Sequence, residues 1–170
     1  MLTSDAGYLE LLADANRSLA SMHLELRRLK YLFDNEWYLA LVNKLADDVA
    51  KAGGSGHTFP QIQLLRNVLE EIATDPDAQD GKGSIGSTQA LYLDFMQTQA
   101  TQSAAVSKAK LTMADKRALM DSFIKDGWLI CTPGGAGRYS IGPRSFLELH
   151  EFLLSLDLPQ DTRAAWQCFL

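Results

Sequence analysis

A cluster of three glycines in this chain could form a phosphate-binding site. Gly134, Gly135 and Gly137 lie in PGGAG, between two strand-like segments. A glycine loop binds phosphate when it joins a buried strand to a helix, because free backbone N–H groups and the positive end of the helix dipole then face the anion. Here a strand-like segment follows the glycines, and the cluster has neither a Lys-Ser or Lys-Thr pair nor G-x-G-x-x-G spacing. The cluster therefore predicts the tip of a β-hairpin, where glycine permits a positive φ.

The three histidines do not form a catalytic or metal-binding constellation. His23, His57 and His150 stand apart, without a His, Cys or carboxylate partner at ligand spacing. Metal binding and catalysis need several groups that converge on one point. The sequence also lacks a G-x-S-x-G nucleophile elbow. We therefore expect no catalytic residue and no cofactor in this chain.

Composition and cysteine use narrow the class of protein. The chain has 170 residues and a net charge of −5, whereas a dedicated nucleic-acid binder usually carries a basic excess. Its two cysteines, Cys131 and Cys168, do not suggest a disulfide framework, and no secretory signal opens the sequence. No apolar run approaches the roughly 18 residues of a membrane span. We expect a soluble intracellular protein whose partners are other proteins.

Apolar periodicity predicts a helix and a hairpin in the first part of the chain. A helix begins after Ser4, because apolar residues recur there at helical spacing. Met22, Leu24 and Leu26 alternate with polar residues, and after Asp34-Asn35 the run EWYLALV alternates again through Trp37, Leu39 and Leu41. This alternation predicts a β-hairpin with a short polar turn and one buried face. The glycine-rich stretch at 53–56 then predicts a connection between two modules.

The second part of the chain is expected to form three helices, a hairpin and a last helix. Thr58 with Gln61 and Thr112 with Asp115 are capping boxes that begin the first and third of these helices. Ser87 or Thr88 begins the second helix, which is expected to carry Leu91, Tyr92, Phe95 and Met96, after an expected mobile loop in TDPDAQDGKGSIGS. WLICT and RYSIG are strand-like, and FLELHEFLLSL has one apolar helical face. This order is typical of the winged-helix version of the helix-turn-helix fold.

Four basic residues are candidate DNA contacts. In a winged helix the third helix can enter a DNA major groove and the wing can touch a neighbouring groove. Lys116, Arg117 and Lys125 lie on that predicted helix, and Arg138 lies on the predicted wing. Acidic residues share the helix, so a solvated charged face is an equally good interpretation.

Three aromatic residues are candidates for binding a protein. Tyr31, Phe33 and Trp37 cluster around the first hairpin. Exposed aromatic side chains supply much of the free energy at interface hot spots, so these residues could anchor a partner. A core position is the alternative interpretation for Trp37.

Three segments of the sequence resemble the non-SMC element 1 subunit of the SMC five/six complex. They are HLELRRLKYLFDNEWYLALVN, FPQIQLLRNVLEEIAT and KDGWLICTPGGAGRYSIGPRSFLELHEFLLSL, followed by a short linker and a cysteine. The similarity runs from about Tyr8 to Cys168. It implies two winged-helix domains and a zinc-binding RING-type domain, a MAGE-type subunit and the kleisin as partners, and a role in DNA repair and recombination in the nucleus.

The resemblance also implies that a RING-type domain gives the family its ubiquitin-ligase character. Cys168 lies where the first cysteine of that domain is expected, and the sequence ends at Leu170, before the second. Structural zinc needs four ligands, so we expect no zinc, no ubiquitin-conjugating enzyme and no ligase activity for this chain alone. The helices that the family carries before Tyr8 are also absent, and we therefore expect a truncated sequence with an incomplete first module.

The sequence thus predicts a mainly α protein with small β-hairpins, an α+β fold of tandem winged-helix modules. The expected divisions are a partial first winged-helix module (1–52), a linker (53–58), a second winged-helix domain (59–158), and a linker with the start of a RING-type domain (159–170). We expect a non-catalytic scaffold that docks a MAGE-type partner and the kleisin. Two alternatives stay open: a winged-helix transcription regulator, and a ubiquitin ligase in a longer gene product.

Overall fold

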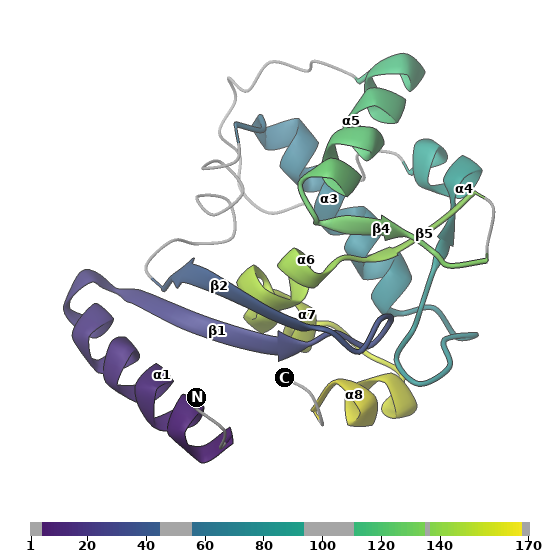
Figure 1. Ribbon diagram of the computed structural model, residues 1–170. Coiled ribbons are helices and arrows are strands. Elements are labelled where there is room, and N and C mark those ends of the chain that lie inside the picture. Colours follow the sequence, from purple (N-terminus) through teal and green to yellow (C-terminus); the bar gives the residue numbers. More distant parts are fainter. Residues whose placement is uncertain (1–4, 45–55, 94–110, 135–136, 168–170) are drawn as a thin grey trace.

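The structure of the chain, a computed structural model, describes residues 5–44, 56–93, 111–134 and 137–167 (Figure 1). The first elements are α1 (Asp5–Leu19), the short helix η1 (Ala20–Met22), β1 (Leu24–Lys30) and β2 (Trp37–Asn43). The others are α3 (Phe59–Ala73), β3 (Ile85–Gly86), α4 (Ser87–Tyr92), α5 (Met113–Lys125), β4 (Leu129–Cys131), β5 (Arg138–Ile141), α6 (Pro143–Glu148), α7 (His150–Ser155) and α8 (Gln160–Gln167). This mixture of helices and small antiparallel sheets confirms the predicted α+β class.

The first predicted hairpin is present and joins two helices. β1 and β2 pair antiparallel, with Leu24 opposite Asn43 and Lys30 opposite Trp37. α1 runs beside β1, and α6 contacts both strands (Figure 1). The hairpin is therefore held between the N-terminal helix and a helix from the far end of the chain.

The second sheet has the strand order β3-β5-β4 and is antiparallel throughout. Ile85 pairs with Tyr139, and Leu129 pairs with Ile141. The element order α3, β3, α4, α5, β4, β5 is that of a winged-helix-like module, with β4 and β5 as the predicted wing. No helix among the described residues is both long enough and apolar enough to cross a bilayer.

One hydrophobic core spans both predicted modules. Leu29 and Tyr31 from the first hairpin belong to the same buried cluster as Val68 of α3, Phe123 of α5 and Phe146 of α6. Each of these side chains is at most 2% exposed. Because the hairpin shares this core, its stability is coupled to that of the winged-helix-like part.

The two predicted capping boxes begin α3 and α5. At α5 the Asp115 N–H donates to Thr112 Oγ1 at 3.1 Å, and the Thr112 N–H donates to Asp115 Oδ2 at 3.0 Å. Hydrogen bonds from Thr112 hold the pKa of the Asp115 carboxyl below its usual value. At α3 the Thr58 N–H donates to Gln61 Oε1 at 2.7 Å. α5 ends at Lys125, and Gly127, two residues later, has a φ of +80° that permits the turn into β4.

Regular elements lie in two segments for which the sequence predicted no helix or strand. The loop expected at 74–87 contains β3. The segment 159–170, expected to be a linker with the start of a RING-type domain, contains α8. Trp166 of α8 is 1% exposed and packs edge-on against Phe146, with 5.1 Å between ring centroids. The indole N–H of Trp166 donates to the Gly81 carbonyl at 2.9 Å. Contacts between distant segments therefore determine the structure of both.

The last predicted helix is divided in two. α6 and α7 meet at Leu149, whose ψ of 22° departs from helical geometry. In the predicted second helix, α4 accounts for the first six residues. Phe95 and Met96, expected on the same helix, lie outside the described residues.

Candidate functional site

An exposed apolar surface lies on the first hairpin. Trp37, Leu39 and Leu41 are 57%, 54% and 54% exposed, whereas their neighbours Tyr38 and Val42 face the core. Side chains alternate along a strand, so the three exposed residues share one face of the sheet. We call this surface, Trp37 with Leu39 and Leu41, the outer hairpin face. The sequence predicted that the face with Trp37, Leu39 and Leu41 is the buried one, which is wrong, because the opposite face of the hairpin packs on the core.

α1 and β1 border the outer hairpin face. The Asn16 side chain accepts a hydrogen bond from the Leu26 N–H at 2.7 Å and donates to the Leu26 carbonyl at 3.0 Å, which fixes α1 against β1. The Arg28 guanidinium lies 4.6 Å from the Trp37 ring centroid and 5.4 Å from that of Tyr8. These contacts place an arginine between two partly exposed aromatic rings, a combination common at protein interfaces.

The three predicted anchors occupy different environments. Tyr31 is 2% exposed, and its hydroxyl donates to the Ile141 carbonyl at 2.7 Å. Burial is the main cause that raises the pKa of the Tyr31 hydroxyl far above its usual value. The Phe33 ring is half-buried, 5.4 Å from that of Tyr31. Tyr31 is therefore a core residue, and Trp37 is the exposed member of the set.

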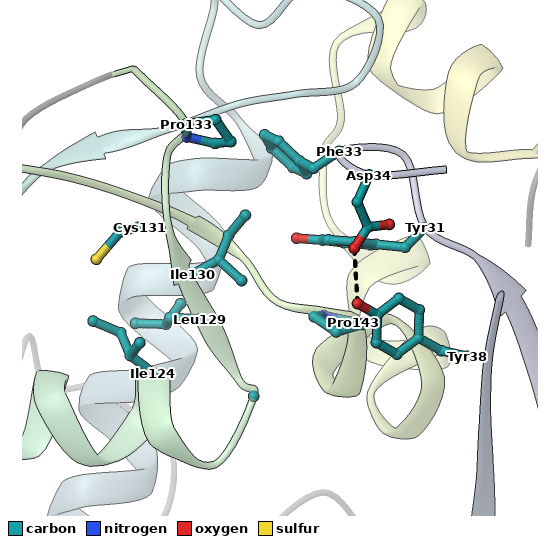
Figure 2. Close-up of a pocket in the computed structure, with 11 residues that line it drawn as sticks. Tyr31, Phe33, Asp34, Tyr38, Ile124, Leu129, Ile130, Cys131, Pro133 and Pro143 are labelled. Carbon is teal, nitrogen blue, oxygen red and sulfur yellow. Dashed lines mark hydrogen bonds between the residues drawn. The ribbon is translucent and has the colours of Figure 1, made fainter. Parts of the chain in front are cut away.

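A hollow lies between the first hairpin and the wing. Its lining includes Tyr31, Phe33 and Asp34 from the turn after β1, and Ile130 and Pro133 from the wing (Figure 2). The volume of the hollow is about 360 Å³. The Tyr38 hydroxyl donates to Asp34 Oδ2 at 2.8 Å, the contact drawn as a dashed line in Figure 2. The hollow is mainly apolar, with one carboxylate among the residues that line it.

The four candidate DNA contacts also occupy different environments in the structure. Lys116 is 8% exposed, and its ammonium donates to the carbonyls of Leu91 and Leu93 at 2.9 and 2.8 Å. It therefore satisfies carbonyls at the end of α4, a buried position that does not fit the predicted contact with DNA. Arg117 and Lys125 are exposed on α5.

Arg138 has a structural contact on the wing. Its Nε and Nη2 atoms donate to the side chain and the carbonyl of Ser84 at 2.9 and 3.0 Å. The residue itself stays exposed. Arg138 thus fastens β5 to the segment before β3 and still presents positive charge to solvent.

Comparison with known proteins identifies the family. The model of the family described as the Nse1 non-SMC component of the SMC5-6 complex matches residues 3–149. This chain belongs to the Nse1 family. A solved chain from a structure described as the Nse1-Nse3-Nse4 complex is similar in fold, with a TM-score of 0.62 and 23% sequence identity. The similarity covers 86% of this chain and 55% of that chain, so this chain spans about half the length of its structural neighbour. No curated protein matches the sequence.

The glycines of this Nse1-family chain have structural roles, in turns and in close packing. Gly134 and Gly137 have φ values of +75° and +76°, as the hairpin interpretation predicts, and Gly135 lies outside the described residues. The sequence does contain G-x-G-x-x-G spacing elsewhere, from Gly81 to Gly86. A Cβ at Gly81 would lie 2.8 Å from the Trp166 ring. That segment leads into β3 and packs against α8, so it does not form a phosphate cradle.

Metal-binding residues do not converge within the part of the Nse1-family chain that the structure describes. No group of three or more His, Cys, Asp or Glu side chains there could hold a metal ion. His57 Nε2 lies 3.4 Å from Asp126 Oδ2 and has no hydrogen-bond partner of suitable geometry. Cys131 is a free, exposed cysteine, and Cys168 lies outside the described residues. The described residues therefore do not fit a zinc site.

Proposed function

We propose that this Nse1-family chain is a non-catalytic scaffold that docks a MAGE-type subunit and the kleisin in the nuclear SMC5-6 complex, and so supports DNA repair and recombination. Family membership supports the assignment, as does the similar fold of a chain from the Nse1-Nse3-Nse4 complex. The observation that carries it is the outer hairpin face, where Trp37, Leu39 and Leu41 are all more than half exposed. Membership of the Nse1 family favours this function over a transcription regulator.

The physical basis of docking is burial of the outer hairpin face. Covering the exposed parts of its tryptophan and two leucines contributes about 1–2 kcal/mol for each side chain. Arg28 beside Trp37 adds a cation that a partner can desolvate, and tryptophan and arginine are both enriched at interface hot spots. Contiguous exposed apolar side chains of this kind mark interaction surfaces on soluble proteins.

Binding of a Trp37 variant tests the proposal. We expect Trp37→Ala to weaken binding to a purified MAGE-type subunit by about tenfold or more, measured by calorimetry, because the variant removes the largest exposed ring. Tyr92→Ala is the matched control, since Tyr92 is 70% exposed on α4, outside the outer hairpin face. Equal affinities for the wild type and the Trp37 variant, or an equal loss in the two variants, would contradict docking through this face.

DNA contact is proposed as a secondary property of the exposed residues Arg117, Lys125 and Arg138. Phosphate contacts release counterions, so each one steepens the dependence of affinity on salt concentration. We expect Arg117→Glu with Lys125→Glu to reduce the salt dependence of duplex binding, measured by fluorescence anisotropy. If the dependence of affinity on salt concentration were unchanged, these α5 residues would not contact DNA.

Zinc binding and ligase activity are proposals for a longer protein only. Cys168 could contribute one thiolate to a RING-type site, which needs three further ligands. We expect a longer chain with a complete RING-type domain to bind zinc, and Cys168→Ser to lower its zinc content, measured by elemental analysis. Unchanged zinc content would exclude Cys168 as a ligand.

A further inference from the structure

The hollow between the hairpin turn and the wing is bordered by an open strand edge. β4 lies at the edge of the sheet β3-β5-β4, and among the described residues it pairs with β5 alone. Figure 2 shows Ile130 of β4 pointing toward Tyr31 and Tyr38, and Cys131 pointing away from them. One wall of the hollow is thus the edge strand itself, with its side chains alternating between two faces.

The register of β4 turns the backbone of Cys131 away from β5. The Thr132 N–H donates to the Arg138 carbonyl at 3.0 Å, and the Gly142 N–H donates to the Trp128 carbonyl at 2.8 Å. Hydrogen-bonded pairs alternate along an antiparallel ladder, so Trp128, Ile130 and Thr132 face β5, and the residues between them direct their N–H and C=O groups to the other side. Cys131 is one of these, and it is exposed. No residue that the structure describes pairs with its peptide groups, which leaves them available to a further strand.

Hydrogen bonds and a ring contact hold the side chains at the floor of the hollow. The Tyr31 hydroxyl is bonded to the Ile141 carbonyl, and its ring meets that of Tyr38 edge-on, with 5.6 Å between centroids. Two hydrogen bonds hold the Asp34 carboxylate. Its Oδ1 accepts from the Glu36 N–H at 2.9 Å, and its Oδ2 accepts from the Tyr38 hydroxyl. A carboxylate oxygen can accept more than one hydrogen bond, so Asp34 can still receive a cation.

We propose that the hollow binds an extended peptide segment of a partner protein, which pairs with the free edge of β4 at Cys131. The segment places an aliphatic side chain against Ile130 and Pro133 and a lysine or arginine beside Asp34. Alternate residues of a strand point to one face, so the basic and the aliphatic residue stand two positions apart. This inference is independent of the outer hairpin face and does not rest on the proposed function.

The chemistry of the lining favours a peptide over other ligands. Asp34 is the one charged residue among the described residues that line the hollow, which disfavours phosphate and other anions. The volume of about 360 Å³ is near the lower limit of the roughly 300–1,000 Å³ of small-molecule pockets. Strand addition to an open edge, with side-chain pockets beside it, is an established mode of peptide recognition.

Two labelled peptides test the proposal on the whole chain under reducing conditions. The first alternates threonine and valine and carries one lysine two residues before a leucine, and the second has glutamate in place of the lysine. We expect the first to bind about fivefold or more tightly than the second, measured by fluorescence anisotropy. We also expect the Cys131 amide to exchange its hydrogen more slowly when the first peptide is bound, because strand pairing occupies that N–H.

Two variants separate strand pairing from a nonspecific apolar contact. Cys131→Pro removes the N–H that faces the peptide, and Cys131→Val keeps it, so binding should fall in the first variant alone. Asp34→Asn keeps the acceptor oxygen but removes the charge, and should abolish the preference for lysine over glutamate. The proposal is overturned if neither peptide binds, if the Cys131 amide stays unprotected in the complex, or if a folded Cys131→Pro binds as well as Cys131→Val.

Discussion

The Tyr31 hydroxyl is the buried polar contact that joins the first hairpin to the wing. Its bond to the Ile141 carbonyl lies where water cannot replace it. We expect Tyr31→Phe to lower the free energy of unfolding by about 1–3 kcal/mol, because the carbonyl of Ile141 loses a buried partner. Urea denaturation at neutral pH measures the difference.

Tyr38 provides the control for that measurement. Its hydroxyl bonds to Asp34 at an exposed position, where water can take its place. Tyr38→Phe should therefore change the free energy of unfolding much less than Tyr31→Phe. Equal losses in the two variants would show that the Tyr31 bond has no special role.

His150 makes stability depend on pH. Burial, and then the positive charge of Arg27, hold the pKa of His150 below its ordinary value of 6.5. The unfolded chain therefore takes up this proton at a higher pH than the folded chain does. The contribution of neutral His150 to stability is therefore complete above about pH 6.5, and it is lost as the pH is lowered toward the depressed pKa.

The His150→Gln variant isolates this contribution. We expect the melting temperature of the wild type to fall more than that of His150→Gln when the pH is lowered from 7.5 to about 5.5. Differential scanning calorimetry at several pH values measures both. Parallel pH profiles in the two proteins would exclude His150 as the cause.

The buried role of Lys116 could not be predicted from its residue type. On the sequence it is one of several basic residues on a predicted helix, with the same interpretation as Arg117. In the structure Lys116 is buried, whereas the residues on either side of it are exposed, and its ammonium donates to carbonyls at the end of α4. That role depends on where α4 ends in space, which helical periodicity does not encode.

At the level of elements, α8 stabilises the loop before β3 through Trp166. We expect Trp166→Ala to lower the free energy of unfolding by about 3–5 kcal/mol, because it removes a fully buried ring and the donor to Gly81. Trp37→Ala is the matched control, since the same substitution at an exposed site should cost much less. Denaturant midpoints that shift equally would contradict a structural role for α8.

Sequence patterns predicted elements better than they predicted contacts between elements. The capping boxes located the starts of α3 and α5, because a cap is a local interaction. β2 was predicted as a strand, but WYLALV is apolar at odd and even positions alike, so alternation could not identify the buried face. β3 has two residues and exists through its pairing with Tyr139 and Arg138. The hollow beside β4 depends on contacts between segments about a hundred residues apart, which no local pattern contains.

On the scale of the whole molecule, the outer hairpin face should limit solubility when no partner covers it. We expect Leu39→Thr with Leu41→Thr to reduce self-association at high concentration, because threonine keeps a strand-compatible shape with less apolar surface. Light scattering across a concentration series measures this. The melting temperature should change little, since both leucines are more than half exposed. Unchanged scattering would show that this face does not drive association.

The three tryptophans divide the molecule into regions that fluorescence can distinguish. Trp37 is 57% exposed, whereas Trp128 and Trp166 are at most 1% exposed. A soluble quencher such as acrylamide should therefore reach Trp37 first and leave the two buried indoles emitting at shorter wavelength. The long-wavelength emission then reports on whatever covers the first hairpin, and the short-wavelength emission reports on the integrity of the core. The native chain thus carries an intrinsic two-channel optical probe, and no external label is needed.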